Sequence, residues 1–452
     1  MHAQRLIVRP GRPLSGAFRP PGDKSITHRA YLIGLLHPGP LEIRNPNLGE
    51  DCRATLRSAR VLGARFENGV LTGAGMKLAE PEGILDCGNS GTTLRLLSGI
   101  LAAQPFLSVL AGDRSLHRRP VERIVEPLRL MGAQVLARGG DRLPPLVLRG
   151  GELRAIGYVA PMASAQVASC VLLAGLFAAG RTTVELPGPA RDHTERMLGS
   201  FGVPIEVHPL AGGGRRTTLT GPGRVTAPAG ALAIPGDFSA AAFFLAAAAA
   251  TPGARVRAEG VGLNPTRSAL LEVLEHMGAG VERAHVRIEG GEDVGDVTVT
   301  GPETLNGFDI PPHWMPRMID EVPAWAIAAA AARGRSRLAG ARELKFKESD
   351  RLAALAANLA RVGIEAHEGA DGLEIIGGTA RGGEVAALDD HRIAMAFATL
   401  GTFARGPVVV DDASTIATSY PGFLETLRGL GAEAEVAEET PRERARRETS
   451  GG

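Results

Sequence analysis

The chain has 452 residues, of which 44% are hydrophobic and 22% are charged, so it is long enough for two domains with one core each. Its 50 basic and 49 acidic residues give a net charge of +1, which excludes a basic surface field for nucleic acid or an anionic membrane; any anion site must be local. Cys52, Cys87 and Cys170 lack metal-ligand or redox spacing, and no run reaches about 18 apolar residues, which predicts a cytoplasmic protein that does not span a membrane.

A helical pattern ends at a glycine six times along the chain, and a short strand-like segment follows each glycine. Each of these glycines lies where a helix C-terminus needs a residue in the left-handed conformation. They are 68 to 85 residues apart, so the pattern predicts six repeated units. The glycines are Gly63, Gly132, Gly202, Gly278, Gly363 and Gly431.

A second helix in each unit is apolar on nearly every side, which predicts that it is buried. These helices are expected at 25–36, 92–103, 164–179, 239–250, 322–332 and 391–404. Helix capping explains the Ser, Asn and Asp residues at their starts. It does not explain Lys24, His391 or Arg392, because a cation opposes the positive end of the helix dipole. We therefore expect the starts of these helices to bind anions.

Two proline and glycine clusters, at 20–22 and 235–236, divide the six units into two groups of three. We expect a contiguous domain of residues 22–235 and a discontinuous domain of residues 1–21 plus 236–438. The residues that follow, 439–452, have no apolar periodicity and are expected to be a disordered tail.

Five motifs follow one another along the chain at these helix starts and in the loops beside them. Their sequences are PGDKSITHR at 21–29, GNSGT at 88–92, RRP at 118–120, KESDR at 347–351 and DHR at 390–392. The series resembles that of the 5-enolpyruvylshikimate-3-phosphate synthase family. The resemblance implies an α/β fold with two similar domains, each made of three βαβαββ repeats around buried parallel helices, an inside-out α/β barrel.

The resemblance also implies a reaction. The enolpyruvyl group of phosphoenolpyruvate is transferred to the 5-hydroxyl of shikimate 3-phosphate and phosphate is released, a step of the shikimate pathway toward chorismate and the aromatic amino acids. No cofactor and no metal take part. The partners implied are these two small molecules, with no nucleic acid and no membrane, and a monomer is expected.

By the same resemblance, two overlapping sets of residues bind the substrates, and arginine forks suit their carboxylate and phosphate groups. The shikimate 3-phosphate set is Lys24, Ser25, Arg29, Ser164, Ala165, Gln166, Asp320 and Lys347. The phosphoenolpyruvate set is Lys24, Asn89, Gly91, Arg119, Gln166, Arg351 and Arg392.

Three residues carry the chemistry that the resemblance implies. Glu348 transfers the proton at C3 of phosphoenolpyruvate. Asp320 binds the attacking hydroxyl and can accept its proton. Lys24 can assist at the hydroxyl or at the leaving phosphate. A carboxylic acid that donates near neutral pH needs a raised pKa, which we expect the closing of a low-dielectric cleft to supply.

Simpler explanations stay open when each residue is taken alone. The 347–351 motif has the spacing of a solvated set of helix salt bridges, and Asp320 could be only a helix N-cap. Arg29 and Arg119 could be surface side chains in an arginine-rich chain. Arg191 is expected on the phosphate side of the shikimate ring.

The sequence disfavours two other functions. A UDP-N-acetylglucosamine enolpyruvyl transferase usually has a cysteine in the loop that corresponds to 112–120, and this loop has none. A non-catalytic polyanion-binding protein needs a basic face with interleaved aromatic residues, and only 4% of this chain is aromatic.

Two positions bear on the site within the resemblance. Other branches of the family place a substrate-contacting lysine near Thr418, and this sequence has none there. Glyphosate competes with phosphoenolpyruvate in this family, and we expect Gly91 to leave open the space that glyphosate needs.

Overall fold

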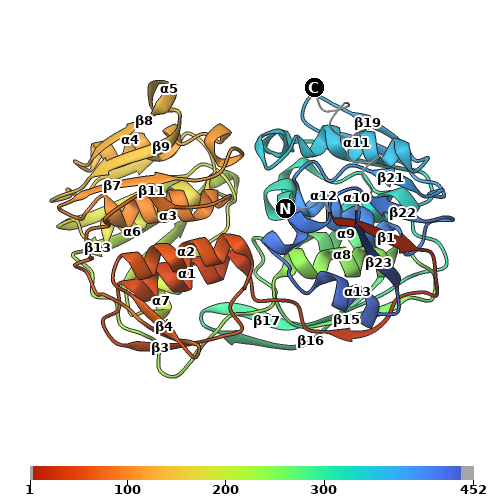
Figure 1. The fold of residues 1–452 in the computed structure, drawn as a ribbon, viewed down its shortest axis with the longest axis horizontal. Helices are drawn as coiled ribbons and strands as arrows, with labels where there is room; N and C mark the ends of the chain where they lie inside the picture. The colour runs from red at the N-terminus through yellow and green to blue at the C-terminus, as the bar shows by residue number, and fades with distance from the viewer. Residues whose placement is uncertain (1–3, 439–452) are drawn as a thin grey trace.

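The computed structural model describes residues 4–438, which form two similar halves that lie side by side (Figure 1). One half is built around apolar residues between 26 and 234. The other is built around residues 6–14 together with residues between 238 and 430. The predicted tail at 439–452 lies outside the described residues. Within residues 4–438, no helix has both the length and the apolar character needed to cross a bilayer.

Six small sheets follow one plan, with three sheets in each half. In five of them the first strand of a unit runs parallel to the second, and the fourth strand lies antiparallel between the second and the third. In the remaining unit, the second of the second half, the first strand is reduced to two isolated parallel bridges, at Asn306 and Asp309. Each half therefore contains three βαβαββ units around buried helices, and the predicted fold class is confirmed.

The three units of the first half combine short strands with the helices that connect them. The first contains β14 (Leu232–Ala233), α1 (Lys24–Leu35), β3 (Pro40–Arg44), α2 (Glu50–Val61), β4 (Arg65–Glu67) and β5 (Val70–Thr72). The second contains β6 (Leu85–Asp86), α3 (Gly91–Leu101), β7 (Leu107–Ala111), α4 (Glu122–Leu130), β8 (Gln134–Ala137), the short α5 (Arg138–Asp141) and β9 (Leu143–Arg149). The third contains β10 (Gly157–Val159), α6 (Ala165–Gly175), β11 (Gly180–Leu186), α7 (His193–Ser200), β12 (Ile205–Pro209) and β13 (Arg215–Gly221).

The second half has the same plan. Its first unit contains β2 (Ser15–Phe18), α8 (Phe238–Ala249), β15 (Arg255–Gly262), α9 (Ala269–His276), β16 (Gly280–Glu289) and β17 (Glu292–Thr300). Its second contains α10 (Val322–Ala331), β18 (Arg335–Leu338), α11 (Arg351–Arg361), β19 (Glu365–Glu368) and β20 (Leu373–Ile376). Its third contains β21 (Gly383–Val385), α12 (His391–Leu400), β22 (Val408–Val410), α13 (Phe423–Gly429), β23 (Glu433–Glu438) and β1 (Gln4–Arg9), the red strand among blue ones in Figure 1.

All six predicted helix-ending glycines have positive φ, between 74° and 109°. After each glycine, the next N–H donates to the carbonyl five residues earlier, as in Ala64 to Ala59 at 3.0 Å and Ile364 to Leu359 at 2.9 Å. This bond closes a helix end only when the residue between adopts the left-handed conformation, where glycine has no side-chain penalty. The predicted repeat is therefore confirmed at its six turning points.

We propose that the chain crosses between the halves at 21–22 and 235–236, the domain limits predicted from the sequence. The residues on either side of each crossing contribute to different cores. The two crossings are also hydrogen-bonded to each other: Asp23 N–H donates to the Pro235 carbonyl at 2.7 Å, and Asp237 N–H donates to the Pro21 carbonyl at 2.8 Å.

Candidate active site

Charged side chains from the helix starts of the two halves meet in one cluster. The Nη1 atom of Arg119, in the first half, lies 3.9 Å from Oε1 of Glu348 in the second. The Nη2 atom of Arg191 lies 2.5 Å from Oδ2 of Asp320, again across the halves. We call this group the interdomain charge cluster. Its members are Lys24, Arg119, Arg191, Asp320, Lys347, Glu348, Arg351 and Arg392.

Lys24 is the first residue of α1, where Asp23 caps the helix by accepting a bond from the Ile26 N–H at 2.9 Å. The Nζ atom of Lys24 donates to Oδ2 of Asp51 at 2.9 Å. Burial alone would lower the pKa of Lys24, but the carboxylates of Asp51 and Glu348 outweigh burial and raise it. Lys24 is therefore a permanent cation at a helix start.

Arg29 is buried, with 4% of its surface exposed, so its interpretation as a surface arginine is wrong. Its guanidinium donates to the Thr194 hydroxyl at 2.6 Å, to the Ser169 hydroxyl at 2.9 Å and to the Ser25 carbonyl at 2.8 Å. Burial lowers the pKa of Arg29 to about 10, and the nearby carboxylates of Glu195 and Asp23 offset this only in part. Helices α1, α6 and α7 thus hold the guanidinium through neutral hydrogen-bond partners.

Arg119 is also largely buried, with 13% of its side chain exposed. It donates to the carbonyl and to the side-chain oxygen of Asn89, at 3.1 and 2.6 Å, and to the Ser115 hydroxyl at 3.1 Å. These neutral partners fix the plane of the guanidinium, and one of its nitrogens lies toward Glu348 of the other half.

Gln166 lies in the first turn of α6 and connects α6 with α3. Its Oε1 accepts a bond from Arg95 at 2.8 Å, and its Nε2 donates to the Thr92 hydroxyl at 3.1 Å. Arg95 also donates to the Pro120 carbonyl at 2.9 Å, beside Arg119. The sequence interpretation missed Arg95, because an isolated arginine in an arginine-rich chain gives no local signal of burial.

The space beside Gly91 is narrower than expected. A side-chain carbon at this position would lie 2.7 Å from Nη1 of Arg95 and 3.8 Å from Nη1 of Arg119. The expectation that Gly91 leaves an open space is therefore wrong: the glycine allows the Arg95 guanidinium to lie against the start of α3.

Arg351 joins three carboxylates from the second half. It is 1% exposed and donates to Oδ2 of Asp390 at 2.8 Å and to Oε2 of Glu348 at 2.5 Å, and its Nη1 lies 3.6 Å from Oδ1 of Asp320. Its burial shows that the interpretation of 347–351 as a solvated salt-bridge set is wrong.

Asp320 is surrounded by cations rather than placed as a helix cap. The N-cap position of α10 is Glu321, without a side-chain capping bond, so the N-cap interpretation of Asp320 is wrong. Lys347 lies 3.7 Å and Arg392 4.0 Å from the Asp320 carboxylate, in addition to Arg191. Burial alone would raise the pKa of Asp320, but these cations hold it well below its usual range.

The remaining predicted residues lie at the starts of α1 and α6. The Ser164 hydroxyl caps α6 by accepting a bond from the Val167 N–H at 3.4 Å, and Ala165 is the first residue of that helix. Ser25 is the second residue of α1. Within residues 4–438, no group of three or more His, Cys, Asp and Glu side chains could hold a metal ion.

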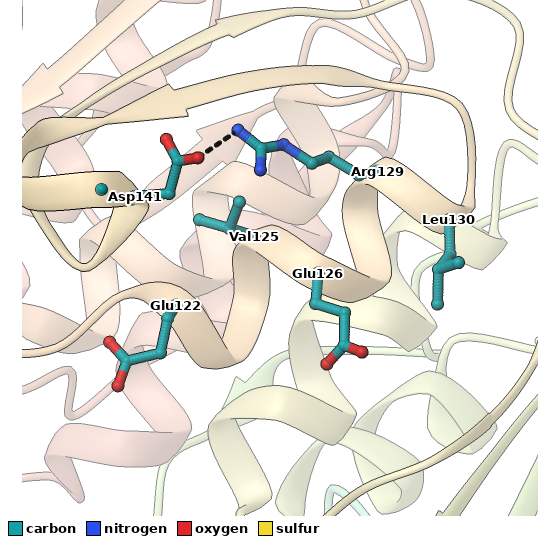
Figure 2. A pocket seen from close by; sticks show the side chains of 7 residues that line it. Glu122, Val125, Glu126, Arg129, Leu130 and Asp141 are labelled. Carbon is teal, nitrogen blue, oxygen red and sulfur yellow. Dashed lines mark hydrogen bonds and ion pairs between the residues drawn. The ribbon is translucent and has the colours of Figure 1, made fainter.

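A separate hollow of about 420 Å³ lies beside α4 and α5, outside the interdomain charge cluster (Figure 2). Figure 2 shows Arg129 reaching Asp141, an ion pair of 2.7 Å, with Glu122 and Glu126 on the same helix. Three carboxylates and one paired guanidinium do not suit an anionic ligand. The interdomain charge cluster, which is rich in cations, is therefore the better candidate for an anion site.

Comparison with known proteins places this chain in a family. The family model described as EPSP synthase (3-phosphoshikimate 1-carboxyvinyltransferase) matches residues 8–427. The chain belongs to the EPSP synthase family. This membership favours the enzymatic function predicted from the motifs over the two alternatives.

Relatives with this name cover nearly the whole chain. The 3-phosphoshikimate 1-carboxyvinyltransferase of Thermus thermophilus is 48% identical over 437 residues, which are 96% of this chain and 100% of the relative. That of Acidithiobacillus ferrooxidans is 47% identical over 439 residues, 96% of this chain and 99% of the relative.

Solved structures agree with the fold. The EPSP synthase of Acinetobacter baumannii is 43% identical, with a TM-score of 0.85 over 96% of this chain and 100% of that one. The enolpyruvyl transferase NikO of Streptomyces tendae has a TM-score of 0.75 over 97% of this chain and 100% of that one; at 18% identity it is similar in fold alone.

The pKa of Glu348 differs from the expectation for a general acid in an EPSP synthase. Burial alone would raise it, but the neighbouring cations, Arg351 and Arg119 foremost, outweigh burial and hold the pKa of Glu348 well below its usual range. The prediction of a raised pKa is therefore wrong for this arrangement, because it considered burial and left out the arginines of both halves.

Proposed function

We propose that this member of the EPSP synthase family transfers the enolpyruvyl group of phosphoenolpyruvate to the 5-hydroxyl of shikimate 3-phosphate. The observation that supports this most directly is the convergence of cations from both halves around two carboxylates, Glu348 and Asp320. Two substrates rich in phosphate and carboxylate need such cations, and an addition followed by an elimination needs two proton-transfer groups.

Phosphoenolpyruvate is bound where Arg119 faces Glu348 and Arg351. Planar guanidinium groups from both halves there suit its carboxylate and phosphate. The start of α3 and the Gln166 amide border the same space. The proposed set is Lys24, Asn89, Gly91, Arg119, Gln166, Arg351 and Arg392.

Shikimate 3-phosphate is bound at the starts of α1 and α6, with Asp320 and Lys347 facing them from the second half. Backbone N–H groups at helix starts favour a phosphate, and Arg29 supplies positive charge between α1, α6 and α7. The proposed set is Lys24, Ser25, Arg29, Ser164, Ala165, Gln166, Asp320 and Lys347.

The proton steps follow from the two carboxylates. In the addition, C3 of phosphoenolpyruvate gains a proton from Glu348, C2 forms a bond to the 5-oxygen, and the hydroxyl proton passes to Asp320. In the elimination, C3 returns a proton to Glu348, the double bond reforms, and the bond from C2 to the phosphate oxygen breaks. The departing phosphate takes up the proton that the hydroxyl lost, with Lys24 as the cation beside it.

The low pKa of Glu348 fits this scheme if the substrate changes the field around it. The carboxylate and phosphate of phosphoenolpyruvate pair with Arg119 and Arg351, the two cations that most lower the pKa of Glu348. Their field at Glu348 is then partly cancelled, burial regains its weight, and the pKa rises. Binding of phosphoenolpyruvate thus favours the protonated form of Glu348.

Phosphate release tests the function. The purified chain is given phosphoenolpyruvate with shikimate 3-phosphate, or phosphoenolpyruvate with UDP-N-acetylglucosamine. We expect phosphate with the first pair only. Release with the second pair alone, or with neither, contradicts the proposal.

We also propose that the enzyme works as a cytoplasmic monomer. Both faces of the interdomain charge cluster come from one chain. The three cysteines are buried and unpaired, as a reducing compartment allows. Light scattering on the purified chain measures the mass, and a dimeric mass contradicts the monomer.

A further inference from the structure

The loop between β15 and α9 forms side-chain contacts with both halves of the molecule. Its Arg267 side chain is 3% exposed and donates to carboxylates on either side of the crossings. Nη1 forms a close ion pair with Asp23 in the first half, and Nη2 donates to Oδ1 of Asp237 at 2.8 Å and to the Ser239 hydroxyl at 2.9 Å in the second.

The two carboxylates are the N-caps of equivalent buried helices. Asp23 caps α1, and Asp237 caps α8 by accepting a bond from the Ala240 N–H at 3.2 Å. Oδ2 of Asp237 also accepts a bond from the backbone N–H of Lys24 at 2.9 Å. Arg267 therefore fixes the start of α8 against the start of α1, and with it the backbone of Lys24.

A second side chain of the same loop reaches another helix start of the first half. The Asn264 amide donates to Oδ1 of Asp192 at 2.6 Å and to Oε2 of Glu292 at 3.0 Å. Asp192 lies between α7 and Arg191, the partner of Asp320. Glu292 in turn pairs with His193 at 2.7 Å, at the start of α7.

The loop is itself firmly held in the second half. The Asn264 side-chain oxygen accepts a bond from the Thr266 N–H at 2.9 Å, and the Arg267 N–H donates to the Asn264 carbonyl at 2.9 Å. Arg317 donates to the Pro265 carbonyl at 2.8 Å. Figure 1 shows the neighbouring hairpin of β16 and β17 extending toward the first half, where the Gly291 carbonyl accepts a bond from Arg196 at 3.1 Å.

We propose that Asn264 and Arg267 form an interdomain clasp that sets how the two halves face each other, and that Arg267 is a positioning residue for the transfer reaction. The clasp acts through Lys24 and Arg191, which it places without touching substrate. Lysine cannot replace Arg267, because one ammonium group cannot reach two carboxylates in a fixed planar fork. The catalytic part of this inference rests on the proposed function.

Steady-state kinetics on the full chain tests the clasp. For Arg267→Gln we expect kcat to fall about 10- to 100-fold, because small displacements of catalytic groups have effects of this size. The KM for shikimate 3-phosphate should rise, and Arg267→Lys should lie between wild type and Arg267→Gln. Asn264→Ala removes no charge, so this variant is expected to fold even if Arg267→Gln does not. It should show a smaller decrease in kcat and a smaller increase in KM. Arg255→Gln, at an exposed arginine of β15, is the matched control and should match wild type.

A distance measurement separates this inference from the proposed function. Spin labels on Leu136→Cys in β8 and Glu365→Cys in β19, both exposed, report the separation of the halves without substrate. We expect Arg267→Gln and Asn264→Ala to shift or broaden the distance distribution. If distances and kinetic constants stay within about twofold of wild type while only the melting temperature falls, the clasp is merely structural and the inference is wrong. If wild type has no activity but the distances shift, the proposed function fails and the clasp stands.

Discussion

The Arg191 guanidinium lies 2.5 Å from the Asp320 carboxylate and joins the loop before α7 in one half to the segment before α10 in the other. Among the cations around Asp320, Arg191 contributes most to the lowering of its pKa. Arg191 therefore keeps Asp320 ionised, as the proposed base must be to accept a proton. The pair connects domain contact with the charge state of the proposed base.

We predict that Arg191→Gln raises the KM for shikimate 3-phosphate about ten- to a hundredfold, the value of a charged hydrogen bond of about 1.5–3 kcal/mol. The KM for phosphoenolpyruvate should change less, because Arg119 and Arg351 remain. Initial rates with each substrate varied in turn provide the measurement. Arg181→Gln is the control, since Arg181 forms an exposed ion pair with Glu206 at 2.8 Å. An equal loss in both variants would contradict the role of Arg191.

Glu348→Gln should lower kcat by about 10²-fold or more, because an amide cannot exchange the C3 proton. Shikimate 3-phosphate should bind with an affinity close to that of wild type, which calorimetry measures. Glu50→Gln serves as the control, because Glu50 is exposed and pairs with the exposed arginines Arg53 and Arg57. Near-normal turnover of Glu348→Gln would remove Glu348 from the mechanism.

The sequence alone predicts the repeated parts of the molecule well, because each is encoded locally. A glycine such as Gly63 ends a helix through its own backbone conformation, and Ser164 or Asp390 caps a helix through bonds to residues two or three positions away. The motifs at such positions contain six of the eight members of the interdomain charge cluster; Arg191 and Asp320 lie outside them.

The partners of those motifs could not be predicted, because they come from distant parts of the chain. Arg267 is 244 residues from Asp23, and nothing around either residue indicates the other. Asp51 is an acidic residue in the first turn of the amphipathic helix α2, a common position for an acid. The sequence therefore gives no sign that it bonds to Lys24. The prediction of the Glu348 pKa was wrong because it left out Arg351 of the same motif, the cation that lowers this pKa most, and Arg119, which reaches Glu348 from the other half.

Two buried histidines should make the protein less stable below neutral pH. Burial lowers the pKa of His28 to about 3 and that of His391 to about 4, both from 6.5. An unfolded chain protonates both residues near pH 6.5 and the folded chain does not, so stability is full above pH 6.5 and falls as pH decreases toward these values. Each histidine contributes a slope of about 1.4 kcal/mol per pH unit across this window.

Asparagine at position 28 can retain the bond that His28 Nδ1 forms with the Thr55 hydroxyl at 2.6 Å, but it does not titrate. We therefore predict that His28→Asn removes about half of the decrease in unfolding free energy between pH 6.5 and 5, whatever its effect at pH 7. Urea titrations at several pH values measure this. His208→Asn, at an exposed histidine, is the matched control for the substitution. An unchanged slope in His28→Asn would show that other groups cause the loss.

Gly91 is the first residue of α3. A methyl group there would lie 2.7 Å from Nη1 of Arg95, a contact that forces the guanidinium to move. Arg95 is not free to swing, because it donates to Gln166 at 2.8 Å and to the Pro120 carbonyl at 2.9 Å. Gly91→Ala should therefore displace Gln166 and the neighbouring Arg119 together, and narrow the phosphoenolpyruvate site by a chain of contacts rather than by filling an empty space.

We expect glyphosate to inhibit the wild-type enzyme in competition with phosphoenolpyruvate and Gly91→Ala to weaken that inhibition about ten- to a hundredfold, since overpacking costs about 1–3 kcal/mol. The KM for phosphoenolpyruvate should rise by less, because the substrate is shorter than the inhibitor. Gly429→Ala is the control: it lies in α13 with open space around the added methyl. Arg95→Lys tests the route, because a lysine cannot hold Gln166 and Pro120 at once, so its phosphoenolpyruvate KM should rise even with Gly91 intact. If Gly91→Ala changes inhibition while Arg95→Lys leaves that KM unchanged, the methyl acts on the inhibitor directly and the route through Arg95 is wrong.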